Sequence, residues 1–199
     1  MDASLWDAVR ARLGAQAGTV REGGYFGSAL AASAEAGPII AVGHSLGVMQ
    51  LLNARPDNMV GLIAINGFTR FTALPDHPHG MAPRLLERMM QRLDQDGGAT
   101  VAAFRTRCGL TPGLPAPVNL PALKQGLELL YGGDCRAALH GLPAPVLAVA
   151  GCHDGIVPPA LSQACFDKLQ WVGDGGHLLP LTHPDLCAQL LLGFAGQFA

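Results

Sequence analysis

The chain has 199 residues, of which 49% are hydrophobic and 14% charged, and its formal net charge is −2. This length can bury one sizeable core, and the near-neutral charge balance gives no reason to expect a nucleic acid or an anionic membrane as partner. No apolar run approaches the ~18 residues of a membrane-spanning helix, and no signal-peptide pattern is visible at the amino terminus.

Apolar periodicity predicts an alternation of helices and strands with one interruption. In chain order, it predicts a helix at 5–13, a weak strand at 19–21, a buried strand at 38–42, a helix at 48–54, a buried strand at 60–66, strands at 146–151 and 169–172, and a final helix from about 184 to 198. Between about 68 and 119, prolines, methionines and arginines recur with helical spacing. We expect an α/β fold, a mostly parallel sheet flanked by helices, with a core of residues 1–67 and 120–199 and an inserted helical cap at 68–119.

A serine stands between a predicted strand and a predicted helix. The segment Gly43-His44-Ser45-Leu46-Gly47 has the form G-x-S-x-G, which in this setting is typical of the nucleophile elbow of α/β-hydrolases. Small residues permit the sharp turn that exposes the serine hydroxyl, and N–H groups at the start of the helix can stabilise an oxyanion. We predict Ser45 as nucleophile and the Leu46 N–H as oxyanion donor. The alternative is a glycine-rich turn that happens to hold a serine.

The acid and the base of a serine hydrolase follow in the expected order. Asp154 comes just after the strand at 146–151, and His177 lies in a glycine-rich loop after the strand at 169–172. A serine hydroxyl needs an imidazole to accept its proton, and the imidazole needs a carboxylate to fix its tautomer. We therefore predict a catalytic triad with Ser45 Oγ within hydrogen-bond reach of His177. Asp154 could instead only form an Asp-Gly turn, and Asp174 is the competing acid, although its position suits a local turn better. His183 is interpreted as the entry to the last helix.

Arginines recur every four residues in the predicted cap. Arg84, Arg88 and Arg92 form one stripe of a helix, with apolar residues at its other positions. The stripe could be a solvated helix face. The functional alternative is a docking surface for an acidic macromolecule, which Arg105 and Arg107 would extend.

Beyond the triad, the chain resembles the pimeloyl-[acyl-carrier-protein] methyl ester esterases of biotin synthesis. Residues 123–130 and 134–139 are similar to the family's segment that links cap to core, and residues 154–158 and 183–184 are similar to its acid and histidine loops. The resemblance extends over nearly all of the chain. It implies a substrate ester on acyl-carrier protein, no cofactor, and contacts from Phe104 and Cys108 to the acyl chain, because 104–108 falls where the family's cap contacts its substrate.

One part of the family's pattern is absent. In the family, strands that end in His-Gly-Trp-Gly supply half of the oxyanion hole and precede a segment similar to residues 1–7, whereas here Met1 stands where that motif should have finished. We expect from this comparison an upstream segment with a central strand. Without it, the Leu46 N–H is the one predicted oxyanion donor, and Tyr25 or Asn66 would have to be considered as a replacement for the second.

Together these features predict a serine carboxylesterase that works through an acyl-enzyme. Its expected partner is acyl-carrier protein bearing an ester, or a small-molecule ester, and we expect a monomer. Five cysteines without C-x-x-C spacing favour reduced thiols in a cytoplasmic protein over a disulfide framework or a metal site. The alternatives are a general short-chain esterase or thioesterase of the same fold, and a non-catalytic hydrolase-like protein kept for binding.

Overall fold

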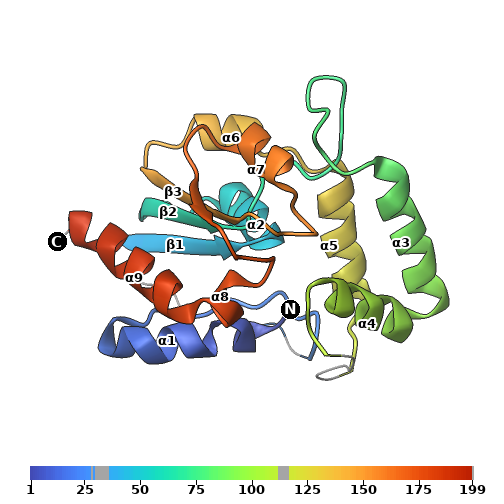
Figure 1. Cartoon of the computed structure of the whole chain (residues 1–199), viewed down its shortest axis with the longest axis horizontal. Helices are drawn as coiled ribbons and strands as arrows, with labels where there is room; N and C mark the ends of the chain where they lie inside the picture. The colour runs from blue at the N-terminus through green and yellow to red at the C-terminus, as the bar shows by residue number, and fades with distance from the viewer. Residues whose placement is uncertain (28, 30–35, 112–116, 199) are drawn as a thin grey trace.

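The computed structural model describes residues 1–27, 29, 36–111 and 117–198, so that residues 112–116 of the predicted cap lie outside it. Its elements in chain order are η1 Ala3–Trp6, α1 Asp7–Leu13, η2 Gly14–Gln16, β1 Ile39–His44, α2 Leu46–Ala54, β2 Met59–Ile65, α3 Pro83–Gln95, α4 Gly97–Arg107, α5 Leu120–Gly132, α6 Arg136–His140, β3 Val146–Gly151, α7 Pro159–Cys165, β4 Gln170–Val172, α8 Leu179–Thr182, α9 Pro184–Ala195 and η3 Gly196–Phe198. The alternation of helices and strands confirms the predicted α/β class (Figure 1).

The described strands form one parallel sheet in the order β1-β2-β3-β4. Each strand is a short apolar run, and β2 is buried along almost its whole length, as expected of strands that are covered on both faces. In the register, His44 lies opposite Ile65 at the ends of β1 and β2, and Ile65 lies opposite Val149 of β3. Because the strands are parallel, their carboxyl ends meet at one edge of the sheet, where the predicted site residues begin.

Side chains of β2 alternate between two cores. Leu62 and Ala64 point into a cluster that includes Val48 and Met49 of α2, whereas Ile63 and Ile65 point into a cluster with Val9 of α1 and residues of α9. The sheet is therefore covered on one face by α2 and on the other by α1 and α9, which lie side by side in Figure 1. This alternation is the period of two of a β-strand.

Helices α3, α4 and α5 stand together beside the sheet, at the right of Figure 1. Helix α3 packs against both α4 and α5, and the apolar side of α3 is buried through Leu86 and Leu93. These contacts bring the helix that follows residue 119 together with the two helices of the predicted cap.

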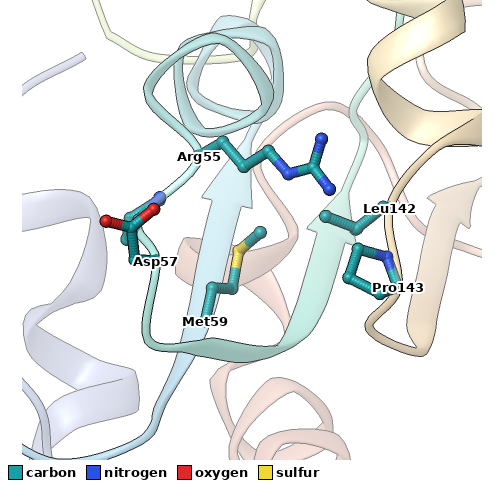
Figure 2. Close-up of a pocket in the computed structure, with 6 residues that line it drawn as sticks. Arg55, Asp57, Met59, Leu142 and Pro143 are labelled. Carbon is teal, nitrogen blue, oxygen red and sulfur yellow. The ribbon is translucent and has the colours of Figure 1, made fainter.

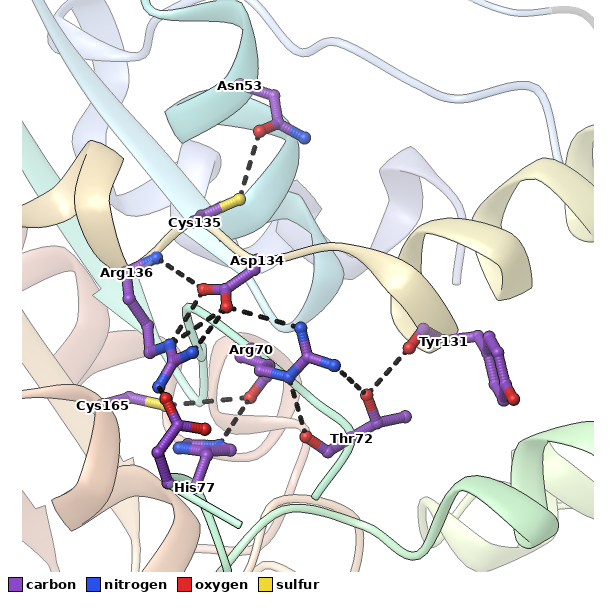
Figure 3. Close-up of polar contacts among 10 residues, drawn as sticks. Asn53, Arg70, Thr72, His77, Tyr131, Asp134, Cys135, Arg136 and Cys165 are labelled. Carbon is purple, nitrogen blue, oxygen red and sulfur yellow. Dashed lines mark hydrogen bonds and ion pairs between the residues drawn. The ribbon is translucent and has the colours of Figure 1, made fainter. Parts of the chain in front are cut away.

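A polar network ties the segment after β2 to the linker between α5 and α6 (Figure 3). The buried Arg70 guanidinium donates to the Thr72 carbonyl and hydroxyl at 3.1 and 3.2 Å and approaches Asp134 at 3.4 Å. Asp134 also pairs with Arg136 at 2.7 Å, and Arg136 with Asp76 at 2.9 Å. A buried guanidinium needs such partners to offset its desolvation, so this network holds the segment after β2 against the linker between α5 and α6.

Most predicted elements are confirmed, but the weak strand at 19–21 is wrong. Residues 17–21 have no regular structure, and Val20 is the one apolar side chain of the run from 19 to 21, where it is half-buried between exposed neighbours. A strand this short and polar buries too little to stabilise an added edge of a sheet.

Candidate active site

Ser45 sits on the turn between β1 and α2 with a backbone that few residues other than glycine adopt. Its φ of 53° and ψ of −125° lie outside the regions favoured by L-residues. Its N–H donates to the Ile65 carbonyl at 3.1 Å, so the ladder between β1 and β2 holds the strained residue in place. Helix α2 starts at Leu46, and the N–H of this first helical residue has no acceptor within the helix. This is the geometry of a nucleophile elbow.

The Asp154 carboxylate is fully enclosed and accepts four hydrogen bonds. Oδ1 accepts from the N–H groups of Ile156 and Val157 at 2.7 and 2.8 Å, and Oδ2 accepts from Asn66 Nδ2 at 2.6 Å and from His177 Nδ1 at 2.8 Å. Burial by itself raises the pKa of Asp154, but these hydrogen bonds and the charge of His177 together outweigh it and lower the pKa. Asp154 is therefore held as an ionised acceptor.

His177 presents one ring nitrogen to Asp154 and leaves the other for chemistry. Because a carboxylate can only accept, Nδ1 carries the proton in this hydrogen bond, and Nε2 is the ring nitrogen left to take up a proton. The side chain is almost completely buried. Within the described residues, no hydrogen bond joins Ser45 Oγ to His177, in contrast to the expected contact; such bonds are often long in the absence of substrate and tighten in the complex.

The alternatives to this acid and base are accounted for by local structure. Asp174 is exposed and lies 3.2 Å from His183 Nε2, and the hydrogen bonds of His177 do not include it. His183 is the N-cap of α9, as predicted. His153 contributes its backbone N–H to the Gly175 carbonyl at 2.8 Å, which is the role of a loop residue.

Two residues that the sequence did not assign to the triad contact it. His44 Nε2 lies 2.7 Å from the His177 carbonyl oxygen, and Asn66 binds both Asp154 and the Gly176 carbonyl. Asn66 is therefore not available as a replacement oxyanion donor, because both of its N–H groups are used. The Tyr25 hydroxyl oxygen accepts a hydrogen bond from Gln50 Nε2 at 3.1 Å, which does not use the Tyr25 O–H as donor. A polar residue directly after a buried strand was the available signal for Asn66.

The predicted cap residues are divided between interior and surface. Phe104 is half-buried against the main core, and Cys108 is buried at the end of α4. Burial raises the pKa of the Cys108 thiol to about 11, so it is protonated at neutral pH. The arginines Arg84, Arg88, Arg92 and Arg107 are exposed, and Arg105 is half-buried.

Two cavities in the described part of the chain are lined by different residues. The larger, of about 290 Å³, lies between the end of α2, the start of β2 and Leu142 (Figure 2). Because it is at the amino ends of the strands, it is remote from Ser45 and Asp154. The smaller, of about 110 Å³, is lined by Arg105, Leu110, Leu178 and residues of the amino-terminal segment, and Leu178 directly follows His177.

Among the described residues, no three His, Cys, Asp or Glu side chains gather closely enough to hold a metal ion. Nor does any described helix combine the length and apolarity that crossing a membrane requires.

Comparison with known families decides the classification. The model of the alpha/beta hydrolase family matches residues 3–190. The chain belongs to the α/β hydrolase family. Solved structures agree at the level of the fold: an esterase from Exiguobacterium antarcticum has a TM-score of 0.81 at 16% identity and covers 97% of this chain and 87% of its own. A thermophilic esterase from Thermogutta terrifontis has a TM-score of 0.73 at 20% identity and covers 99% and 86%.

Curated relatives within the α/β hydrolases narrow the activity. A pimeloyl-[acyl-carrier protein] methyl ester esterase of Klebsiella pneumoniae (strain 342) is 29% identical over 240 residues, covering 99% of this chain and 90% of the relative. One of Stenotrophomonas maltophilia (strain R551-3) is 31% identical over 179 residues, covering 79% and 69%. The resemblance inferred from the sequence is thereby confirmed, and this α/β hydrolase is a carboxylic ester hydrolase.

Proposed function

We propose that this hydrolase cleaves the methyl ester of pimeloyl-[acyl-carrier protein] in biotin synthesis and releases methanol. The main support for the proposal is the 2.8 Å hydrogen bond from His177 Nδ1 to Asp154, which lies at the same edge of the sheet as Ser45 on its strained turn. The names of the curated relatives support the substrate.

In the acylation step, Ser45 Oγ attacks the ester carbonyl carbon while His177 Nε2 takes the serine proton. The tetrahedral intermediate collapses, the bond to the methoxy oxygen breaks, and the imidazolium gives its proton to that oxygen, so that methanol leaves. Asp154 keeps the Nδ1 proton in place and stabilises the imidazolium without itself accepting a proton. Its lowered pKa suits this role.

In the deacylation step, His177 Nε2 takes a proton from a water molecule, whose oxygen attacks the acyl carbon. Collapse of the second intermediate returns the proton to Ser45 Oγ and frees the carboxylic acid. The negative oxygen of both intermediates needs a donor, and the Leu46 N–H at the start of α2 is the proposed one. The positive end of α2 adds to this stabilisation.

Phe104 and Cys108 are proposed to contact the acyl chain. Support comes from the position of α4: its residue Arg105 and the later residue Leu110 line the smaller cavity together with Leu178, next to the proposed base. Half-buried Met89 and Met90 lie on α3 and pack against the same core; such flexible thioethers adapt to an apolar chain.

Arg84, Arg88 and Arg92 are proposed to dock acyl-carrier protein, with Arg105 and Arg107 as extensions. The three arginines of α3 are exposed on one stripe and make no ion pair with another described residue. An unpaired basic stripe fits an acidic partner, which exposed charges attract over about 10 Å at 0.1 M salt.

The proposed enzyme is a cytoplasmic monomer. All five cysteines are free thiols, which fits a reducing compartment. Sedimentation across a concentration series is expected to give the mass of one chain throughout.

The catalytic proposal is tested with two substrates, methyl pimeloyl-[acyl-carrier protein] and p-nitrophenyl butyrate. Ser45→Ala is expected to abolish hydrolysis of both while the thermal melt is retained, because a half-buried hydroxyl contributes little packing. Equal kcat/KM for the two substrates would instead indicate a general short-chain esterase. No turnover of either by the unsubstituted chain would indicate a non-catalytic protein.

The docking proposal is tested by replacing Arg84, Arg88 and Arg92 with alanine. We expect a higher KM for the carrier-linked ester and unchanged hydrolysis of the small ester. Arg10→Ala is the matched control, because Arg10 is an exposed arginine on α1. Equal effects on both substrates, or no effect on either, would make the stripe a solvated helix face.

A further inference from the structure

The loop that carries His177 has little stiffness of its own. Residues 173–177 read Gly-Asp-Gly-Gly-His, and glycines leave a backbone many conformations. A general base must nevertheless be held within a fraction of an ångström of its working position. The loop therefore has to be fixed by contacts from outside it.

Three consecutive carbonyl groups of the loop each accept one hydrogen bond. The Gly175 carbonyl accepts from the His153 N–H at 2.8 Å, just beyond β3. The Gly176 carbonyl accepts from Asn66 Nδ2 at 3.1 Å, just beyond β2. The His177 carbonyl lies 2.7 Å from His44 Nε2, the last residue of β1. The loop thus crosses the carboxyl edge of the sheet, with one carbonyl bound at the end of each of β1, β2 and β3.

We propose that His44 and Asn66 are positioning residues that fix the His177 loop through these two carbonyls and so hold the imidazole against Asp154. The inference rests on the proposed function of His177 as the general base. The donor from β3 is a backbone N–H that any residue supplies, whereas the donors from β1 and β2 depend on these two side chains.

His44 suits the role because it acts as a neutral donor. A carbonyl can only accept, so His44 Nε2 must carry the proton, and in a neutral ring Nδ1 then has none. Burial, with the neighbouring charge of His177, lowers the pKa of His44 to about 3. Its ring lies 4.9 Å from that of His177, centroid to centroid, so it also limits sideways movement of the base.

Asn66 suits the role because its amide uses both N–H groups. One holds the Asp154 carboxylate at 2.6 Å and the other holds the Gly176 carbonyl. Its Oδ1 is buried and has no partner among the described residues, which is unfavourable for a polar group removed from water. The backbone of Asn66 is also in the left-handed region, with a φ of 47°. The unpartnered oxygen and the positive φ are both unfavourable, and an asparagine is expected at such a position where its two side-chain N–H donors are needed.

Four variants test the proposal in the full chain. Asn66→Gly removes the amide and keeps a residue that tolerates positive φ, and Asn66→Asp replaces the N–H donors with oxygen beside Asp154. His44→Phe removes the donor but keeps a ring, and His44→Gln restores a side-chain N–H. His140→Phe, at an exposed histidine of α6, is the control.

We expect kcat to fall by about 10- to 100-fold in Asn66→Gly and His44→Phe, with KM changed less than about threefold, because misplacement of a base affects the chemical step. His44→Gln should recover most of the loss, and Asn66→Asp should be at least as impaired as Asn66→Gly. If Asn66→Gly, or His44→Phe with an unchanged melt, keeps full kcat, the positioning role is refuted.

The same assay separates failure of this inference from failure of the proposed function. Activity of Ser45→Ala at the unsubstituted level would refute the catalytic proposal itself. Loss of activity in Ser45→Ala together with full activity in Asn66→Gly and His44→Phe would refute only the positioning roles. If His44→Phe fails to fold, Asn66→Gly with the melting curve as reference decides the outcome.

Discussion

Val48 of α2 is packed against glycines at the ends of two strands, and this contact allows a sharp test of how the nucleophile turn is built. A Cβ added at Gly67 would lie 2.3 Å from Val48 Cγ2, far inside the 3.5–4.0 Å of a normal carbon contact. Val48 is completely buried, so its side chain has no free space to enter. Gly67→Ala is therefore expected to destabilise the fold.

The size of this effect follows from overpacking. Extra methyl groups in a packed core cost about 1–3 kcal/mol, and an overlap of more than 1 Å predicts the upper end of that range for Gly67→Ala. Val48→Ala alone should cost about 2–3 kcal/mol from lost burial and a small cavity. In the double variant the new methyl group fills the space that the two valine methyls leave, although Val48 Cβ remains 3.0 Å away. The double variant should therefore cost less than the sum of the single ones by about 2 kcal/mol.

Gly43→Ala is the matched control for this cycle. A Cβ at Gly43 would meet the Val48 backbone, with N at 2.8 Å and Cα at 2.9 Å, and these atoms remain in Val48→Ala. Urea unfolding of each variant gives the free energies. Rescue of Gly67→Ala without rescue of Gly43→Ala is the expected result. A cost below about 0.5 kcal/mol for Gly67→Ala, or equal rescue of both glycine variants, would refute the packing argument.

Three further predictions concern strain, acid and buried charge. Ser45→Gly should be more stable than Ser45→Ala by about 1 kcal/mol, because φ is 53° at this position; equal melting temperatures would contradict the strain. The pKa of His44 is lowered from 6.5 to about 3 in the folded chain, so as the pH falls the His44 ring is protonated in the unfolded chain before it is protonated in the folded one. Up to roughly 4 kcal/mol of stability should therefore be lost as the pH falls from 6.5 toward 3. Urea unfolding across that range should show a smaller loss in His44→Gln; parallel curves would count against the prediction. Asp134→Ala should cost about 2–3 kcal/mol of stability because it removes the carboxylate that pairs with the buried Arg70. Arg136 is more exposed, so Arg136→Ala should cost at most about 1 kcal/mol. A larger loss in Arg136→Ala than in Asp134→Ala would refute this account of the network.

Much of the core and the proposed triad could be predicted because both follow local rules. The strands that end near Ser45 and Asp154 are continuous apolar runs, and the glycines around Ser45 signal a tight turn. The direction of parallel strands then brings the residues that follow them to one edge. The hydrogen bond between Asp154 and His177 is the outcome that this reasoning expected.

The remainder depends on contacts that sequence patterns do not encode. The weak strand predicted at 19–21 has the composition of an edge, but whether it pairs depends on the neighbours that the fold provides. The donors His44 and Asn66 bind carbonyls 133 and 110 residues away along the chain, and no periodicity reports such a pairing. Neither did the spacing of the arginines show that Arg105 is half-buried while Arg107 is exposed.

The attachment of the His177 loop to the ends of β1, β2 and β3 has a consequence for folding. Each attachment joins parts of the chain that are distant in sequence, and such contacts form late because the chain must first close long loops. Helices and individual strands can therefore be present before the base reaches its place. During refolding, recovery of ester hydrolysis should lag behind recovery of helical signal, and under mild denaturant it should be the first property to be lost.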